Sequence, residues 1–188
     1  MSDSAVVHAR GIQAAPVVAW AVRALALGAL MLATAQPAAA QQRPSRLGEH
    51  GDWTAATHVE SGRKVCYAFT RPARSEPGGR QNVLLTVLHR QGQRDAVILT
   101  AGYAYPANAT VEVTVGTTEL EFYTSGSSAA PRDRAAALRA FRNGREAVAR
   151  GPAATGRGNV TDTFSLSGFS AAYEAIGKEC PAAGGARR

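Results

Sequence analysis

The chain has 188 residues, of which 45% are hydrophobic, and its formal net charge is +7. Its basic residues are scattered rather than in runs, and no nucleic-acid reader motif is present, so the sequence predicts no nucleic-acid partner. The two cysteines lie far apart without a neighbouring histidine pair, so the sequence predicts no metal site.

An apolar run near the N-terminus predicts a secretory signal peptide over residues 1–40. Residues 24–33 (ALALGALMLA) are uncharged, follow Arg10 and Arg23, and precede a small-residue cleavage site that ends at Ala40. The run is too short to span a bilayer, which takes about 20 residues. The alternative is a buried N-terminal helix, which nothing amphipathic supports. Cleavage after Ala40 would leave one domain of ordinary size and no transmembrane segment.

Short strand-like runs follow a predicted flexible leader at residues 41–50. The first four runs are divided by Gly- and Pro-rich turns and cover residues 51–57, 64–70, 82–89 and 95–101. In the second run Val65, Tyr67 and Phe69 share one face, and the residues between them share the other. The third run is apolar on both faces, which is typical of a central strand.

The clearest alternation is TVEVTV at residues 110–115, where three valines face one way and polar side chains the other. Gly116 then turns the chain, and residues 118–124 alternate again with Leu120 and Phe122 inward, so these two runs predict a hairpin. Six short strands with closely spaced turn signals predict a mostly β fold, a sandwich of antiparallel sheets.

The pattern changes at residues 131–144 (PRDRAAALRAFRNG). Pro131, a run of helix-forming residues and Gly144 predict one helix in a late crossover. Residues 145–150 and 160–166 predict two further strands, and the glycine-rich stretch between them is a connecting loop. This loop lacks the Lys-Ser/Thr pair of a phosphate-binding loop, so no cofactor is predicted.

The segment SGFSAAYEAIGK at residues 167–178 predicts a short C-terminal helix with Ser167 or Ser170 as its N-cap. The predicted domain therefore extends over residues 51–180, and a flexible tail is expected over residues 181–188. Cys66 and Cys180 both fall in this domain. Because an exported protein meets an oxidising compartment, the two cysteines are predicted to form a disulfide.

The three serines of residues 165–170 (SLSGFS) invite comparison with a hydrolase nucleophile. A nucleophile elbow needs G-x-S-x-G, and no glycine stands before Ser167. No histidine or carboxylate stands at a motif spacing that would activate a serine. No catalytic residue is therefore predicted, and a serine hydrolase stays as a remote alternative with Ser167 or Ser170 as its nucleophile.

Recognition residues are predicted on a loop and on the arginine-rich helix. Tyr103 and Tyr105 lie in a predicted loop (AGYAYPANAT), where exposed tyrosines suit recognition, although ordinary packing at a domain rim is the alternative. Arg139 and Arg142 lie on the predicted helix. The expected partner is a protein or a glycan or other envelope component, and the sequence does not predict an oligomeric state.

Several segments together resemble the invasion-associated locus B family of exported bacterial proteins. They run from an early GDW through KVCYA and AGYAYP to VTVGTTELEFYT and GRGNVTDTFSLSGFSAAYEAIGKEC, and so cover residues 51–180. The resemblance implies an immunoglobulin-like β-sandwich in the periplasm, secreted, or at the outer envelope, and a part in host-cell colonisation. It implies no catalytic residues.

The sequence as a whole therefore predicts a non-catalytic binding protein of the bacterial envelope. The second interpretation is a periplasmic structural or envelope-stress protein, whose loss would change membrane integrity without any host present.

Overall fold

The structure, a computed structural model, describes residues 43–182. The predicted signal peptide and the last six residues of the predicted tail fall outside the described residues. Within them, eleven strands and two helices are formed. The first half of the sheet consists of β1 (Ser45–His50), β2 (Trp53–Glu60), β3 (Arg63–Thr70), β5 (Val83–Arg90) and β6 (Gln93–Ala101).

The second half of the sheet holds the remaining strands. These are β9 (Ser128–Pro131), β8 (Thr118–Ser125), β7 (Thr110–Val115), β10 (Glu146–Pro152), β11 (Asn159–Ser165) and β4 (Arg74–Glu76). Helix α1 (Arg134–Asn143) lies between β9 and β10 in the sequence, and helix α2 (Phe169–Glu179) follows β11. The prediction of a mostly β fold with a crossover helix and a C-terminal helix is confirmed.

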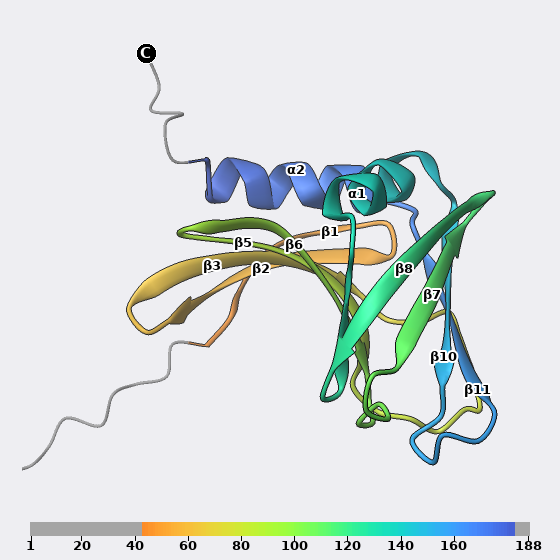
Figure 1. Cartoon of the computed structure of the whole chain (residues 1–188). Helices are drawn as coiled ribbons and strands as arrows, with labels where there is room; N and C mark the ends of the chain where they lie inside the picture. Colours follow the sequence, from red (N-terminus) through yellow and green to blue (C-terminus); the bar gives the residue numbers. More distant parts are fainter. Residues whose placement is uncertain (1–42, 183–188) are drawn as a thin grey trace, which may run out of the picture. The chain divides into compact units, whose positions relative to one another are not determined.

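All strand pairs are antiparallel, and the order is β1-β2-β3-β5-β6-β9-β8-β7-β10-β11-β4. The two layers of the sandwich-like fold are therefore halves of one continuous sheet. They meet at the short β6–β9 pairing, where Leu99 lies opposite Ala129 and Thr100 opposite Ser128. Figure 1 shows the two halves at a steep angle to each other, with α2 above the first half and α1 at the upper end of the second half.

One core fills the space between the two halves and the helices. Trp53 on β2, Phe122 on β8, Phe164 on β11 and Phe169 at the start of α2 are each at most 1% exposed. The rings of Trp53 and Phe169 meet edge to face at 5.0 Å between centroids. The Trp53 indole N–H donates to the backbone oxygen of Ser165 at 3.0 Å, so the polar end of this buried ring is satisfied.

Helix α2 begins at a glycine rather than at a capping serine. Gly168 occupies the N-cap position with φ of 87°, and no side-chain cap hydrogen bond is formed, so the prediction of Ser167 or Ser170 as the N-cap is wrong. A Cβ at Gly168 would lie 1.8 Å from the backbone oxygen of His50, a close approach that only glycine permits. Ser167 instead accepts a hydrogen bond from the Asp52 amide at its own backbone oxygen.

The predicted flexible leader is also wrong for residues 45–50. These residues form β1, which pairs with β2 so that Ser45 lies opposite Thr57 and His50 opposite Trp53. The register shifts once, between Arg46 and Gly48. The composition of this segment is poor in strand-forming residues, so its order comes from pairing with β2 and not from its own propensity. The predicted loop after β3 likewise contains the short edge strand β4.

Candidate functional site

The first half of the sheet is apolar on both of its faces. Cross-strand register places Cys66 opposite His89 and Ala68 opposite Val87, on the face that α2 covers. The alternate residues point away from α2 and form what we call the outer face. Its large apolar members are Val65, Tyr67, Phe69, Leu84, Leu88 and Ile98. None of them belongs to the hydrophobic core cluster.

The corresponding face of the second half is polar. Along β7 and β8 the valines, Leu120 and Phe122 point inward, and the outward positions carry Thr110, Glu112, Thr114, Glu119, Glu121 and Tyr123. This is the ordinary pattern of an antiparallel sheet with one solvated face. The outer face of the first half departs from that pattern, and contiguous apolar surface of this kind marks interaction sites in soluble proteins.

Three rings form a row across the outer face. His58 on β2 meets Tyr67 on β3 edge to face with centroids 5.3 Å apart, and Tyr67 and Phe69 lie nearly parallel at 5.9 Å. Burial raises the pKa of the Tyr67 phenol, so its hydroxyl stays protonated. Rings that are held against each other in this way give a large contact area at a low cost in side-chain entropy on binding.

No second layer packs on the outer face within the part of the chain that the structure describes. The substantial contacts of β2, β3 and β5 are with neighbouring strands and with α2. In Figure 1, α2 lies above these strands and their outer face points downward. Tyr67, Phe69 and Leu88 are consequently half-buried rather than enclosed.

The predicted recognition tyrosines are not exposed at a loop tip. The Tyr103 hydroxyl donates to the backbone oxygen of Pro152 at 2.8 Å. The rings of Tyr103 and Tyr105 meet edge to face with their centroids 5.0 Å apart. Tyr105 packs against the core, and burial strongly raises its pKa. Both rings therefore pack at the rim of the domain and fasten the loop before β7 to the end of β10.

A buried ion pair that the sequence did not reveal lies beside these tyrosines. Arg80, in the loop before β5, donates to both carboxylate oxygens of Asp162 on β11, and the bond to Oδ2 is 3.1 Å long. Arg80 also donates to the backbone oxygen of Ala101 at 2.8 Å. The Ser75 hydroxyl on β4 donates to the same carboxylate at 2.7 Å. The Arg80 guanidinium also lies 5.7 Å from the centre of the Tyr103 ring. This cluster joins three segments that are distant in the sequence.

The two predicted arginines of α1 do not converge with the tyrosines. Arg139 is exposed and lines a groove between α1 and the β7–β8 turn. The Arg142 guanidinium lies 4.6 Å above the Tyr173 ring and so links α1 to α2. Figure 1 shows α1 at the upper end of the second half-sheet and the loop before β7 at its lower end. The four predicted residues therefore form no common surface.

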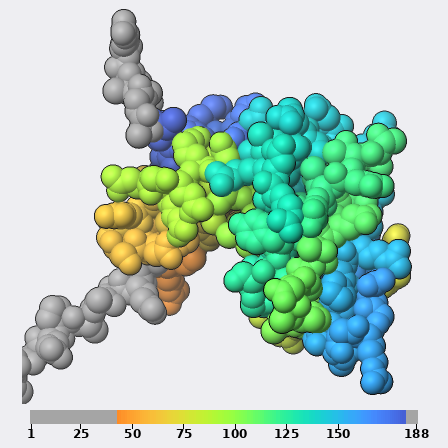
Figure 2. Space-filling model, viewed as in Figure 1, coloured from red at the N-terminus to blue at the C-terminus, as the bar shows by residue number. Residues whose placement is uncertain are grey.

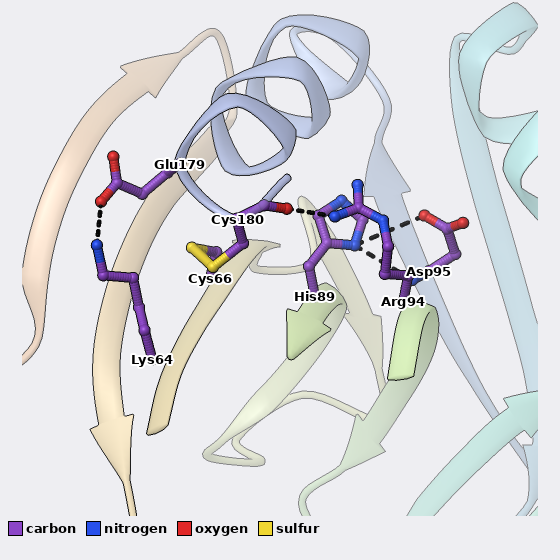
Figure 3. The surroundings of a disulfide bond; sticks show 7 residues. All are labelled: Lys64, Cys66, His89, Arg94, Asp95, Glu179 and Cys180. Carbon is purple, nitrogen blue, oxygen red and sulfur yellow. Dashed lines mark hydrogen bonds and ion pairs between the residues drawn. A yellow bond between two sulfur atoms is a disulfide. The ribbon is translucent and has the colours of Figure 1, made fainter. Parts of the chain in front are cut away.

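The predicted disulfide is present. Cys66 on β3 and Cys180 at the end of α2 are bonded, with their Cα atoms 6.0 Å apart and a sequence separation of 114. Figure 3 shows the surrounding polar contacts, in which Lys64 pairs with Glu179 at 2.6 Å and Arg94 donates to the Cys180 backbone oxygen. These contacts hold the C-terminal end of α2 against the tips of two hairpins.

A fully buried histidine lies next to this disulfide. His89 accepts a hydrogen bond from the Asp95 amide at Nδ1, at 3.2 Å, whereas its Nε2 has no partner among the described residues. Its ring meets Tyr173 edge to face, and the Tyr173 hydroxyl donates to the Asp95 carboxylate. Burial lowers the pKa of His89, and Arg94 lowers it further, against a smaller opposing effect of Asp95.

This lowered pKa predicts a loss of stability in mild acid. Below pH 6.5, the ordinary pKa of histidine, His89 is protonated in the unfolded chain but stays neutral in the folded chain. The free energy of unfolding therefore falls as pH falls. Between pH 7.5 and 5.5, we expect His89 to lower the free energy of unfolding by up to about 1.4 kcal/mol. The measurement is urea unfolding of the wild type and His89→Leu at both pH values. Equal losses in the two proteins would contradict this assignment.

The serine cluster has no catalytic geometry in the described structure. Ser167 and Ser170 are exposed, and no hydrogen bond joins a histidine side chain to Ser165, Ser167 or Ser170 within residues 43–182. The same part of the chain holds no group of three His, Cys, Asp or Glu side chains that is suited to a metal ion. None of its helices is both long and apolar enough to cross a membrane.

The sequence did contain one signal for the outer face. The predicted disulfide requires Cys66 to face the final helix, and the two-residue period of a strand then turns Val65, Tyr67 and Phe69 away from it. Arg80, Asp162 and His89 had no comparable signal, because their partners lie far away in the sequence.

Comparisons with known proteins agree with this architecture. The family model described as Invasion associated locus B (IalB) protein matches residues 53–177. The crystal structure of invasion associated protein b from Bartonella henselae aligns with a TM-score of 0.51 and 22% sequence identity, over 70% of this chain and 97% of that chain. At this identity the likeness concerns the fold alone. No curated protein matches the sequence.

Proposed function

Because the chain belongs to the invasion associated locus B family, we propose that it is an exported bacterial envelope protein that acts by binding and not by catalysis. The predicted signal peptide and the disulfide, which suits an oxidising compartment, support export to the periplasm or beyond. Host interaction is the use that the neighbour's description as an invasion associated protein suggests. Neither the family description nor that of the neighbour names an enzyme.

The uncovered outer face is the observation that carries this proposal. Apart from Val65, which is buried, its aromatic and aliphatic side chains are only half-buried, because no described helix packs over them. Tyrosine, phenylalanine and arginine at such a face are the residue types enriched at binding interfaces. The protein therefore works as a compact module that presents one recognition face.

Binding to the envelope tests the proposal. Residues 41–188, purified in the oxidised form, are mixed with washed envelope fragments of the source bacterium and sedimented, and the bound fraction is measured. We expect Phe69→Ser to reduce the apparent affinity about tenfold, because the lost burial of a half-exposed ring is worth about 1–1.5 kcal/mol.

The matched control is Tyr123→Ser, which removes an exposed aromatic ring, 49% exposed, from the polar outer surface of the second half-sheet. It is expected to leave envelope binding unchanged. Equal binding by wild type and Phe69→Ser would overturn the role of the outer face. Labelling of Ser167 or Ser170 by a fluorophosphonate probe would instead support the hydrolase alternative.

A further inference from the structure

We infer that the outer face binds an anionic phospholipid surface, with the tips of two hairpins in contact with the lipid phosphates. The inference rests on the proposed function, since it names the partner of the same face. Three features carry it: the apolar centre of the face, the excess of cationic side chains at one of its ends, and a groove where the two meet.

The centre of the outer face suits the interfacial region of a bilayer. Tyr67 and Phe69 lie at its middle, with Leu84, Leu88 and Ile98 on the neighbouring strands. These side chains offer broad apolar contact and few groups that a protein or glycan partner would need for hydrogen bonding. Tyrosine, with an apolar ring and a polar tip, is a residue type that settles at membrane interfaces.

Positive charge is concentrated at the end of the face where the β2–β3 and β5–β6 hairpins turn. The groove on the outer-face side of these tips is lined by two cationic side chains, Arg63 and Arg90, and by the carboxylate of Glu60, whereas Lys64, Arg94 and Glu179 line the adjoining groove on the α2 side. Lys64 pairs with Glu179 at 2.6 Å and Arg90 with Glu60 at 3.4 Å. The outer-face side of the tips therefore keeps a net charge of +1, carried by Arg63, which complements anionic headgroups.

The groove on the outer-face side brings charge and apolar surface together. It is lined by Glu60, Ser61, Arg63, Val65, Arg90 and Gln91. Val65 lies directly opposite Arg90 in the register, so an apolar floor adjoins the guanidinium. Arg63 is exposed and forms no ion pair in the described structure, which leaves its guanidinium free for a phosphate.

The remaining charges of the face are balanced. Arg46 and Glu49 on β1 form their own pair, and at the opposite end of the strands Asp52 lines a groove together with Arg71. The cationic excess is thus confined to the hairpin tips, which Figure 2 shows side by side in orange-yellow and lime. Such a distribution favours one orientation, in which the tips contact the headgroups and the aromatic row contacts the outer part of the acyl region.

Vesicle sedimentation tests the inference with residues 41–188, which lack the apolar run 24–33 that would bind lipid by itself. Vesicles of phosphatidylcholine alone are compared with vesicles that contain one-third phosphatidylglycerol. We expect binding to the anionic vesicles only, and weakening as salt rises, because exposed charges are screened over about 8–10 Å.

Variants separate this surface from general charge. Arg63→Ala is expected to weaken vesicle binding about fivefold, and Phe69→Ser and Leu88→Ser about tenfold each. The matched controls Arg139→Ala on α1 and Tyr123→Ser on β8 remove an exposed cation and an exposed ring elsewhere, and are expected to bind as the wild type does. Melting temperatures of all variants confirm that they are folded.

The outcomes distinguish this inference from the proposed function. Binding to envelope fragments through Phe69 without binding to anionic vesicles would overturn the lipid partner and leave the binding role intact, with an acidic protein or a glycan as the partner. Vesicle binding that Arg139→Ala weakens as much as Arg63→Ala does would overturn the assigned surface. Vesicle binding by Phe69→Ser and Leu88→Ser that equals the binding of the wild type would also overturn the assignment of the outer face as the lipid-binding surface.

Discussion

Asp162→Ala is expected to lower the free energy of unfolding by about 3–5 kcal/mol, because it leaves a buried arginine without its counter-charge. The Asp162 side chain is 6% exposed and that of Arg80 13%, so water cannot replace the lost partner freely. The Ser75 hydroxyl would also lose its acceptor. Urea unfolding at pH 7 measures the loss, and a loss of this size is a large fraction of the stability of a single domain.

Two further variants show whether the loss comes from the unpaired charge. Glu121→Ala breaks the Arg132–Glu121 pair at 2.9 Å, in which both side chains are more than half exposed, and should cost less than about 1 kcal/mol. The double variant Arg80→Met/Asp162→Leu replaces both charges by apolar groups and should be more stable than Asp162→Ala alone. A double variant as unstable as the single one would show that packing, and not charge, explains the effect.

Loss of the disulfide is expected to be comparably large. Cys66→Ala/Cys180→Ala removes a cross-link across 114 sequence positions, and in the chain-entropy model such a loop contributes about 4–5 kcal/mol. Since Cys180 ends α2, we also expect the last turn of this helix to become the first site of proteolysis. Thermal and urea unfolding, with and without a dithiol reductant, provide the measurement.

Reductant serves as the control for this experiment. It should destabilise the wild type by a similar amount and leave the double alanine variant unaffected. An unfolding midpoint of the wild type that reductant does not move would contradict a stabilising role for the Cys66–Cys180 bond.

Much of the fold could be predicted because its signals are local. The alternation of TVEVTV predicted β7, and the inward positions of Leu120 and Phe122 were predicted correctly. The helix near residues 131–144 was also predicted, although it begins at Arg134 because Asp133 caps it and Pro131 ends β9. β1 and β4 were missed because pairing with neighbouring strands, and not their own composition, orders them.

The outer face could not be predicted from the sequence, because the pattern of an apolar strand does not show which of its two faces is covered. The run at residues 82–89 is apolar on both faces, which predicts a strand with both faces covered. In the structure only the face of Val87 and His89 is in the core, whereas Leu84 and Leu88 belong to the outer face. Periodicity shows that a strand has two apolar faces, but which of them remains uncovered depends on where α2 packs.

The polar clusters could not be predicted for a different reason, which is that their members are far apart in the sequence. Arg80 and Asp162 are 82 positions apart, and Tyr173 reaches Asp95 from 78 positions away. Nothing in the spacing of these residues indicates that they meet. Tyr103 and Tyr105 were correctly placed in a loop, but this ion-pair cluster and the packing against β10 turn the rings inward.

The most direct test of a recognition role for the outer face is the ratio of envelope binding by Phe69→Ser to that by Tyr123→Ser, measured on the same preparation of envelope fragments. Both variants replace an aromatic ring by serine, and they differ in the half of the sheet from which the ring is removed. We predict about tenfold weaker binding for Phe69→Ser and wild-type binding for Tyr123→Ser. Equal binding by the two variants would contradict a recognition role for the outer face.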